Sequence, residues 1–284
     1  MRRTKFVDKV LPYIVLTVIA LLFLIPLLWV VFASLDAYPL QSMKIPQEWT
    51  LENYKEVLTS TKNQMAFGNG LFISLFQAVL VVLLAALAAY PLSRYEMKHK
   101  RMFMFTILFM TSLPVTALMV PVYHLFLTLH LYDNRIGVIL FQSASSLPYA
   151  IWMMKNFMDS VPMDLEEAAW VDGCTVWAGI KRIVTPLMLP GLCMVGVYTF
   201  SGSWGNFFVP YILLGSASKF TASITLYQFF GAYGQIAYGQ LAAYSILYTA
   251  PSVLLYTLSQ KFMSQGFSMP VSYTHLTLPT ILLV

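Results

Sequence analysis

The sequence predicts an all-α integral membrane protein with six transmembrane helices, and three observations lead to this fold class. Of the 284 residues, 58% are hydrophobic and only 10% are charged, whereas an ordinary soluble domain carries about 25% charged residues. Uncharged apolar runs recur along the chain, and each has about the twenty residues that a helix needs to cross a bilayer. No run alternates apolar and polar residues as the strands of a membrane barrel do.

The six apolar runs define the expected spans. Lipid offers no hydrogen-bond partners, so each run must satisfy its own backbone groups as a helix. The first run is too long for the apolar part of a signal peptide, and we interpret it as an uncleaved span. The runs lie near residues 13–33, 71–92, 103–127, 136–157, 189–214 and 241–262.

The distribution of lysine and arginine predicts the orientation of these spans, because basic residues accumulate in cytoplasmic loops. With the N-terminus inside, twelve of the seventeen basic residues fall on the cytoplasmic side. Both termini are therefore expected to be cytoplasmic. The net charge of +5 lies in clusters beside the apolar runs, a pattern that favours membrane orientation over binding of nucleic acid.

The acidic residues restrict the class of transporter. All twelve Asp and Glu residues lie outside the six runs, whereas ion-coupled carriers usually keep an ionisable group within the membrane. His124 has no acidic partner in its run, and we interpret it as a packed interior residue. A secondary carrier or channel that acts alone is therefore the less favoured alternative.

No motif in the chain predicts catalysis or a bound cofactor. The sequence has no phosphate-binding G-x-x-x-x-G-K-[ST] loop, so any ATP that drives transport must be hydrolysed by another chain. Cys174 and Cys193 lack the spacing of a metal site and are interpreted as structural. We expect a transport subunit without catalytic or metal-binding residues.

The loop between the fourth and fifth runs predicts a helical hairpin outside the bilayer. Asp164 can cap a helix and Glu167 occupies its third following position, as in a capping box. Gly173 is expected to end this helix. Thr175 can cap a second short helix that Pro186 is expected to end.

Small side chains give this hairpin a surface that another backbone can approach closely. Ala168, Ala169 and Gly173 are the small residues, and Trp170 and Trp177 offer bulky anchors. These features suit docking of a partner, but an ordinary interfacial helix can also carry alanines. Local physics alone leaves both interpretations open.

The spacing of the hairpin resembles the EAA loop of ABC importer permeases, whose pattern is Glu-Ala-Ala, three residues, Gly, nine residues and Ile-x-Leu-Pro. Only Thr185, which stands where that pattern has Leu, departs from it. The resemblance implies a coupling loop within residues 158–190 that contacts a separate ATPase. Its expected contact residues are Glu166, Glu167, Ala168, Ala169, Asp172, Gly173, Ile183 and Pro186.

Other strings resemble carbohydrate importer permeases of the maltose/glycerol-phosphate type, in particular the second permease of each pair. They are TLENYKEVL, AAYPLSRY, LPYAIWMMKNFMDSVP and GSWGNFFVPYILL. Tyr149 replaces a usual Phe, and Gly205-Asn206 replaces a usual Asn and acidic pair. The chain divides into a cytoplasmic N-terminus (1–12), a six-span permease domain (13–265) and a tail (266–284). The tail is atypical of the family and its YTHLTLP string resembles adapter read-through, so we assign it no function.

The resemblance implies a type I importer permease fold and a set of partners. These are a second homologous permease, two copies of an ATP-binding subunit that holds ATP and Mg, an extracytoplasmic solute-binding protein and membrane lipid. The expected location is a bacterial-type plasma (inner) membrane. The expected cargo is a sugar or a related polyol or oligosaccharide; a polyamine or amino acid importer is the alternative.

A sugar path needs aromatic faces for C–H groups and amide or hydroxyl partners for sugar hydroxyls. Aromatic residues in membrane helices also serve as packing or interface residues, and this interpretation stays open. The candidate path residues are Gln142, Tyr149, Tyr198, Ser203, Trp204 and Asn206.

Overall fold

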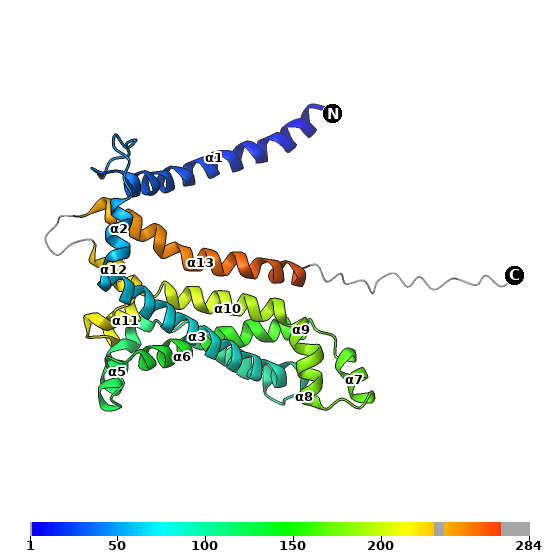
Figure 1. Ribbon diagram of the computed structural model, residues 1–284. Coiled ribbons are helices and arrows are strands. Elements are labelled where there is room, and N and C mark those ends of the chain that lie inside the picture. Colours follow the sequence, from blue (N-terminus) through cyan, green and yellow to red (C-terminus); the bar gives the residue numbers. More distant parts are fainter. Residues whose placement is uncertain (1, 230–235, 268–284) are drawn as a thin grey trace. The chain divides into compact units, whose positions relative to one another are not determined.

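The computed structural model describes residues 2–229 and 236–267, and helices form most of this part of the chain (Figure 1). Its only β-type pairing among the described residues is an isolated bridge between Asp36 and Trp49. The elements are α1 (Arg2–Leu35), α2 (Glu52–Thr59), α3 (Thr61–Arg94), α4 (Lys100–Met110), α5 (Val115–Thr128), α6 (Arg135–Asp159), α7 (Asp164–Val171), α8 (Val176–Gly179), the π-helix η1 (Ile180–Val184), α9 (Thr185–Leu187), α10 (Leu189–Trp204), α11 (Phe208–Leu213), the 3₁₀-helix η2 (Ala217–Lys219), α12 (Ala222–Gln228) and α13 (Tyr238–Phe267).

Four of these helices are long and apolar enough to cross a membrane alone, within the part of the chain described. They are Val10–Leu35, Thr61–Arg94, Arg135–Asp159 and Tyr238–Met263. Two further pairs of shorter helices qualify only when each bent pair is counted as one span, which gives up to six spans. The predicted number of spans is confirmed on that count.

The apolar side chains of α1 show what kind of solvent this fold needs. None of the most apolar window of this helix is buried within the chain, and side chains such as Tyr13 and Phe23 are 73% and 69% exposed. Because water would not favour such a surface, lipid or another membrane protein must cover it. The helix begins at Arg2, so residues 2–12 continue the same helix as the first span.

The predicted continuous span over 103–127 is wrong, because α4 ends at Met110 and α5 begins at Val115. The Thr111 and Ser112 hydroxyls donate hydrogen bonds to carbonyls three residues back, at 2.6 and 2.7 Å. Pro114 follows with extended backbone (ψ 119°), and a proline also disfavours helical backbone at the residue before it. The span is therefore two helices joined by a turn.

The predicted span over 189–214 is also wrong at its end, because α10 stops at Trp204 and the separate helix α11 follows. Asn206 lies in the break, and its side-chain oxygen accepts a hydrogen bond from the backbone N–H of Val209 at 3.0 Å. Such a local side-chain bond offers the backbone an alternative to continuing the helix. Because the residues of α11 are also apolar, the sequence shows no sign of this boundary.

The chain divides into two compact units, and each is described by itself. The first comprises the described parts of 1–77, 114–144 and 200–254. Within it, the Asn69 amide donates to the carbonyls of Ser218 and Phe220 at 2.8 and 3.1 Å. The Arg135 guanidinium donates to the Asn69 side-chain oxygen at 3.0 Å. These bonds satisfy a buried amide, as buried polar groups require, and they tie α3 to the start of α6 and to the loop before α12.

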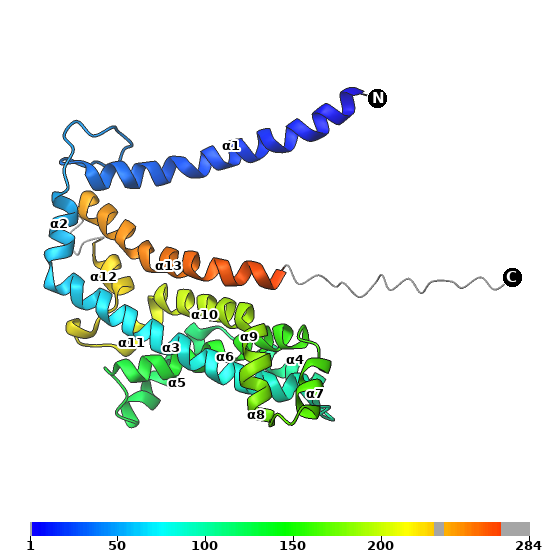
Figure 2. The same ribbon diagram turned by 45° about the vertical axis from the view of Figure 1, so that its right-hand side comes forward.

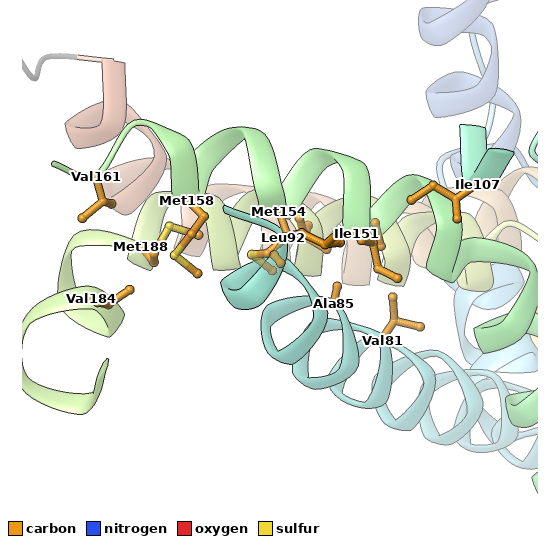
Figure 3. Packing of buried hydrophobic residues seen from close by; sticks show 13 residues of the cluster. Val81, Ala85, Leu92, Ile107, Ile151, Met154, Met158, Val161, Val184 and Met188 are labelled. Carbon is orange, nitrogen blue, oxygen red and sulfur yellow. The ribbon is translucent and has the colours of Figure 1, made fainter. Parts of the chain in front are cut away.

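The second unit comprises 78–113, 145–199 and the described chain from 255 onward. Its core is formed by one face of α3 and one face of α6, each marked by buried residues about one helical turn apart. Fully buried alanines allow the backbones to approach closely. The core consists of Val81, Ala85, Ala89, Leu92, Ile107, Ala150, Ile151, Met154, Met158, Val161, Val184, Met188 and Val195 (Figure 3).

The division into an N-terminus, a permease domain and a tail stays a prediction. Most of the predicted tail, from residue 268 onward, lies outside the described residues.

Candidate functional site

The predicted hairpin forms between α6 and α10, with α7 as its first arm (Figure 2). Gly173 adopts a φ of +87°, and a side chain there would meet no atom within 4 Å. The backbone conformation alone therefore calls for glycine. The N–H groups of Gly173 and Cys174 donate to the carbonyls of Trp170 and Ala169 at 3.0 and 2.9 Å. The prediction that Gly173 ends this helix is confirmed.

The predicted cap at the start of α7 is wrong. Asp164 is already the first residue of the helix, Met163 precedes it, and no side-chain capping bond forms there. The backbone N–H groups of Glu166 and Glu167 donate instead to the Met163 carbonyl, at 2.9 and 3.1 Å. Three acidic residues still occupy the first turn, where the helix dipole favours negative charge.

The second arm of the hairpin begins as predicted and ends differently. The Thr175 hydroxyl oxygen accepts a hydrogen bond from the Ala178 N–H at 3.3 Å and caps α8. Pro186, however, does not end the helix; it lies inside α9, in the first turn where proline is tolerated. The helix is instead wound as the π-helix η1 just before Thr185 and Pro186. The Thr185 hydroxyl donates to the Ile180 carbonyl at 2.9 Å. The chain then bends by 70° at the break before α10.

Two adjacent glutamates of α7 lie in opposite environments. Glu166 is fully buried, and one of its carboxylate oxygens lies 2.6 Å from Nε of Arg94. The Tyr90 hydroxyl donates to its other oxygen at 3.0 Å. Glu167 is exposed. Only Glu167 can therefore offer its carboxylate to a partner without opening the fold.

The exposed face of the hairpin combines small, apolar and acidic residues. Val171 is 87% exposed and Trp177 is 71% exposed, whereas Ala169 is buried and faces the protein. Trp170 is half-buried, and its indole lies 3.4 Å from where a side chain of Gly179 would begin. The other predicted loop residues on the surface are Glu167, Ala168, Asp172, Gly173 and Pro186, and Ile183 is half-buried.

The structure pairs two of the predicted path residues and gives two others contacts that fix their side chains. In the first unit, the Ser203 hydroxyl donates to the side-chain oxygen of Gln142. Trp204 is 4% exposed, its indole N–H donates to the Tyr248 carbonyl at 2.9 Å, and its ring stacks on Tyr248. The Asn206 side chain is held by the backbone of α11. Trp204 is thus buried by packing and Asn206 is half-buried beside the break before α11, and a role of either residue in the path stays a prediction.

The remaining path candidates, Tyr149 and Tyr198, lie together in the second unit. Their ring centroids are 5.0 Å apart, and Tyr198 is 45% exposed. Trp152, which sequence reasoning missed, stacks on Tyr149 with centroids 5.8 Å apart. Its position three residues after Tyr149 on the same helix was the available signal. This aromatic cluster is where the predicted residues retain an accessible ring.

The apolar spans define a membrane-embedded protein, and the hairpin gives it an exposed helical surface. A family model described as binding-protein-dependent transport system inner membrane component matches residues 81–269, and the chain belongs to this family. It is thus a transport subunit of an inner membrane, as predicted.

Relatives and solved structures agree with this family. The chain is 32% identical to the inner membrane ABC transporter permease protein YcjP of Escherichia coli, over 82% of this chain and 84% of that one. It is 29% identical to the diacetylchitobiose uptake system permease protein NgcG of Streptomyces coelicolor, over 84% and 80%. It shares its fold with a chain in the crystal structure of a bacterial ABC transporter that imports the acidic polysaccharide alginate. That match has a TM-score of 0.79 at 22% identity and covers 92% of this chain and 98% of the other. The predicted type I importer permease fold is confirmed.

Proposed function

We propose that this chain forms half of the translocation path of an ATP-driven carbohydrate importer and that a separate ATPase docks on its α7 hairpin. The importer would contain a second permease, two ATP-binding subunits that hold ATP and Mg, and an extracytoplasmic solute-binding protein. The observation that carries this proposal is the exposed face of the hairpin, which no other segment of the described chain covers.

The chemistry of this face suits a protein partner. Val171 and Trp177 present exposed apolar surface that a protein partner would bury. Ala168 and Gly173 leave room for a close backbone approach, and Glu167 adds one charge that can pair at the edge of the contact.

The orientation that docking requires follows from the positive-inside distribution. The hairpin itself carries Lys181 and Arg182, and Arg94 and the basic residues just after it, up to Arg101, lie on the same predicted side. We therefore place both termini and the hairpin in the cytoplasm, where ATP is available. Labelling of single introduced cysteines with a membrane-impermeant thiol reagent tests this placement.

The carbohydrate part of the proposal rests on two supports. The relatives reported above include a diacetylchitobiose permease and an alginate importer. In addition, Tyr149, Trp152 and Tyr198 form a cluster of rings that sugar C–H faces can stack on. Polyamine and amino acid importers stay as alternatives, because the fold does not select the solute.

Reconstitution of the importer tests this function. Permease, partner permease and ATPase would be co-expressed, purified through a tag on this chain, and placed in liposomes with the cognate binding protein. We expect the ATPase to co-purify and uptake of labelled oligosaccharides to require ATP. Uptake of an amino acid or polyamine in place of sugars would overturn the carbohydrate assignment. Uptake without ATPase would support a carrier that acts alone.

A further inference from the structure

The ion pair between Arg94 and Glu166 is unusual because both partners are buried. The side chains are 6% and 1% exposed, and the distance from Nε of Arg94 to the carboxylate is 2.6 Å. The Tyr90 hydroxyl completes the site with its hydrogen bond to the same carboxylate. Removing two charges from water is costly, so such a pair contributes little net stability and is better explained by the geometry that it fixes.

This geometry joins three segments. Glu166 belongs to α7, Tyr90 and Arg94 belong to the end of α3, and Arg94 also donates to the Met158 carbonyl at the end of α6, at 3.3 Å. Helix α7 has only eight residues, too few to be stable alone. The direction of α7 must therefore be set by contacts with the rest of the fold. The buried group of Arg94, Glu166 and Tyr90, which we call the clasp, supplies hydrogen bonds of fixed geometry for this.

A second bond ties the same two helix ends together. The Ser93 hydroxyl donates to Asp159 at 2.6 Å, and Asp159 also pairs with Lys155. The helices α3 and α6 that meet here share the core of the second unit, so a force on α7 would reach their packed faces directly.

We propose that Arg94 and Tyr90 are positioning residues of the coupling loop. They hold Glu166 so that α7 moves as one piece with the ends of α3 and α6, and motion of the ATPase reaches the spans instead of bending the loop. The proposal rests on the proposed function. It assigns the neighbouring glutamates different tasks: Glu167 contacts the ATPase, and Glu166 transmits the motion inward.

The same substitution at these two glutamates separates the tasks. In the complete importer in liposomes, two quantities are measured: ATPase retained on the tagged permease, and solute molecules moved per ATP hydrolysed. We expect Glu166→Gln to retain the ATPase and to lower the transport ratio, the number of solute molecules moved per ATP hydrolysed, by about tenfold. Glu167→Gln should instead weaken ATPase retention. Arg94→Gln should match Glu166→Gln, and the double variant should be no worse than either single one.

Two further variants separate positioning from stability. The double variant Arg94→Met/Glu166→Met removes the buried charges and should fold and assemble, but it should keep the low transport ratio because an apolar contact has no fixed direction. In a background with Cys174→Ser and Cys193→Ser, Arg94→Cys/Glu166→Cys joined by a short bifunctional thiol reagent should regain transport. The crosslink replaces the clasp even if the single glutamine variants fold poorly.

The outcomes are distinct. If the wild-type permease retains no ATPase, the proposed function fails and this inference fails with it. If the wild type retains the ATPase but Glu166→Gln keeps the wild-type ratio, only the inference is wrong. A full recovery in the double methionine variant would show a purely structural role, and a crosslink that blocks transport would show that the clasp must open.

Discussion

Replacing Gly173 by alanine should weaken the docking of the ATPase, in the first place through the conformation of the backbone. The residue has a φ of +87° and open space around it, so the added methyl group meets no other atom of this chain. Holding a residue with a side chain in the left-handed region costs about 1–2 kcal/mol. If the turn of the variant relaxes in the free permease and returns to the left-handed conformation only in the complex, this strain opposes binding. The affinity for the ATPase should then fall by roughly five- to thirtyfold. Titration of purified ATPase onto the permease in nanodiscs measures this change.

Two matched variants control for other effects of the change. Gly68→Ala also adds a methyl group into open space, but Gly68 lies inside α3 without a positive φ. It should leave affinity unchanged and slightly raise thermal stability. Gly173→Asn should relieve the strain in the turn, because asparagine tolerates left-handed backbone, and the affinity that it still loses measures the room that Gly173 leaves for the partner. Equal affinities for Gly173→Ala and Gly68→Ala would refute the reasoning.

Three other predictions concern the path, the fold and pH. Tyr198→Ala removes an exposed ring and should raise the solute concentration for half-maximal uptake, while ATPase retention stays unchanged; equal uptake would contradict a path role. Trp204→Phe removes the indole bond to Tyr248 and should lower stability by about 1 kcal/mol without altering solute preference. Burial alone would raise the pKa of Asp133, but hydrogen bonds from Lys219, Ser216 and backbone N–H groups hold that pKa below its ordinary 3.8. A lowered folded pKa stabilises the protein above about pH 4, and this effect is lost as the carboxylate protonates at lower pH. Lys219→Met should therefore reduce the fall of the unfolding temperature between about pH 4 and lower pH.

The number of spans could be predicted from sequence because lipid permits few alternatives to a helix. The breaks within spans were harder to see. Pro91, Pro148 and Pro251 all lie inside continuous helices, so a proline alone does not mark a boundary. Pro114 follows Thr111 and Ser112, whose hydroxyls bond back to carbonyls three residues earlier. Pro148 also follows two serines and a leucine and yet lies inside α6, so the residue types alone do not mark the break.

The coupling loop was predictable because its signal is local spacing, and Gly173 and Thr175 act as their residue types suggest. The clasp was not, since Arg94 lies 72 residues from Glu166 and was counted as a loop charge that orients the membrane. Its place four residues after Tyr90 on one helix face was the available signal. The sequence likewise does not show which candidate path residues face a solute, because this depends on how the helices pack.

Site-specific photocrosslinking tests the docking claim most directly. A photoreactive amino acid would be placed at Val171, which is 87% exposed on α7, and separately at Leu129, which is 54% exposed just after α5 on the predicted outer side. Illumination of the importer during ATP-driven uptake should link position 171, and not position 129, to the ATP-binding subunit. ATP-driven uptake with no link from position 171 to that subunit would contradict the account.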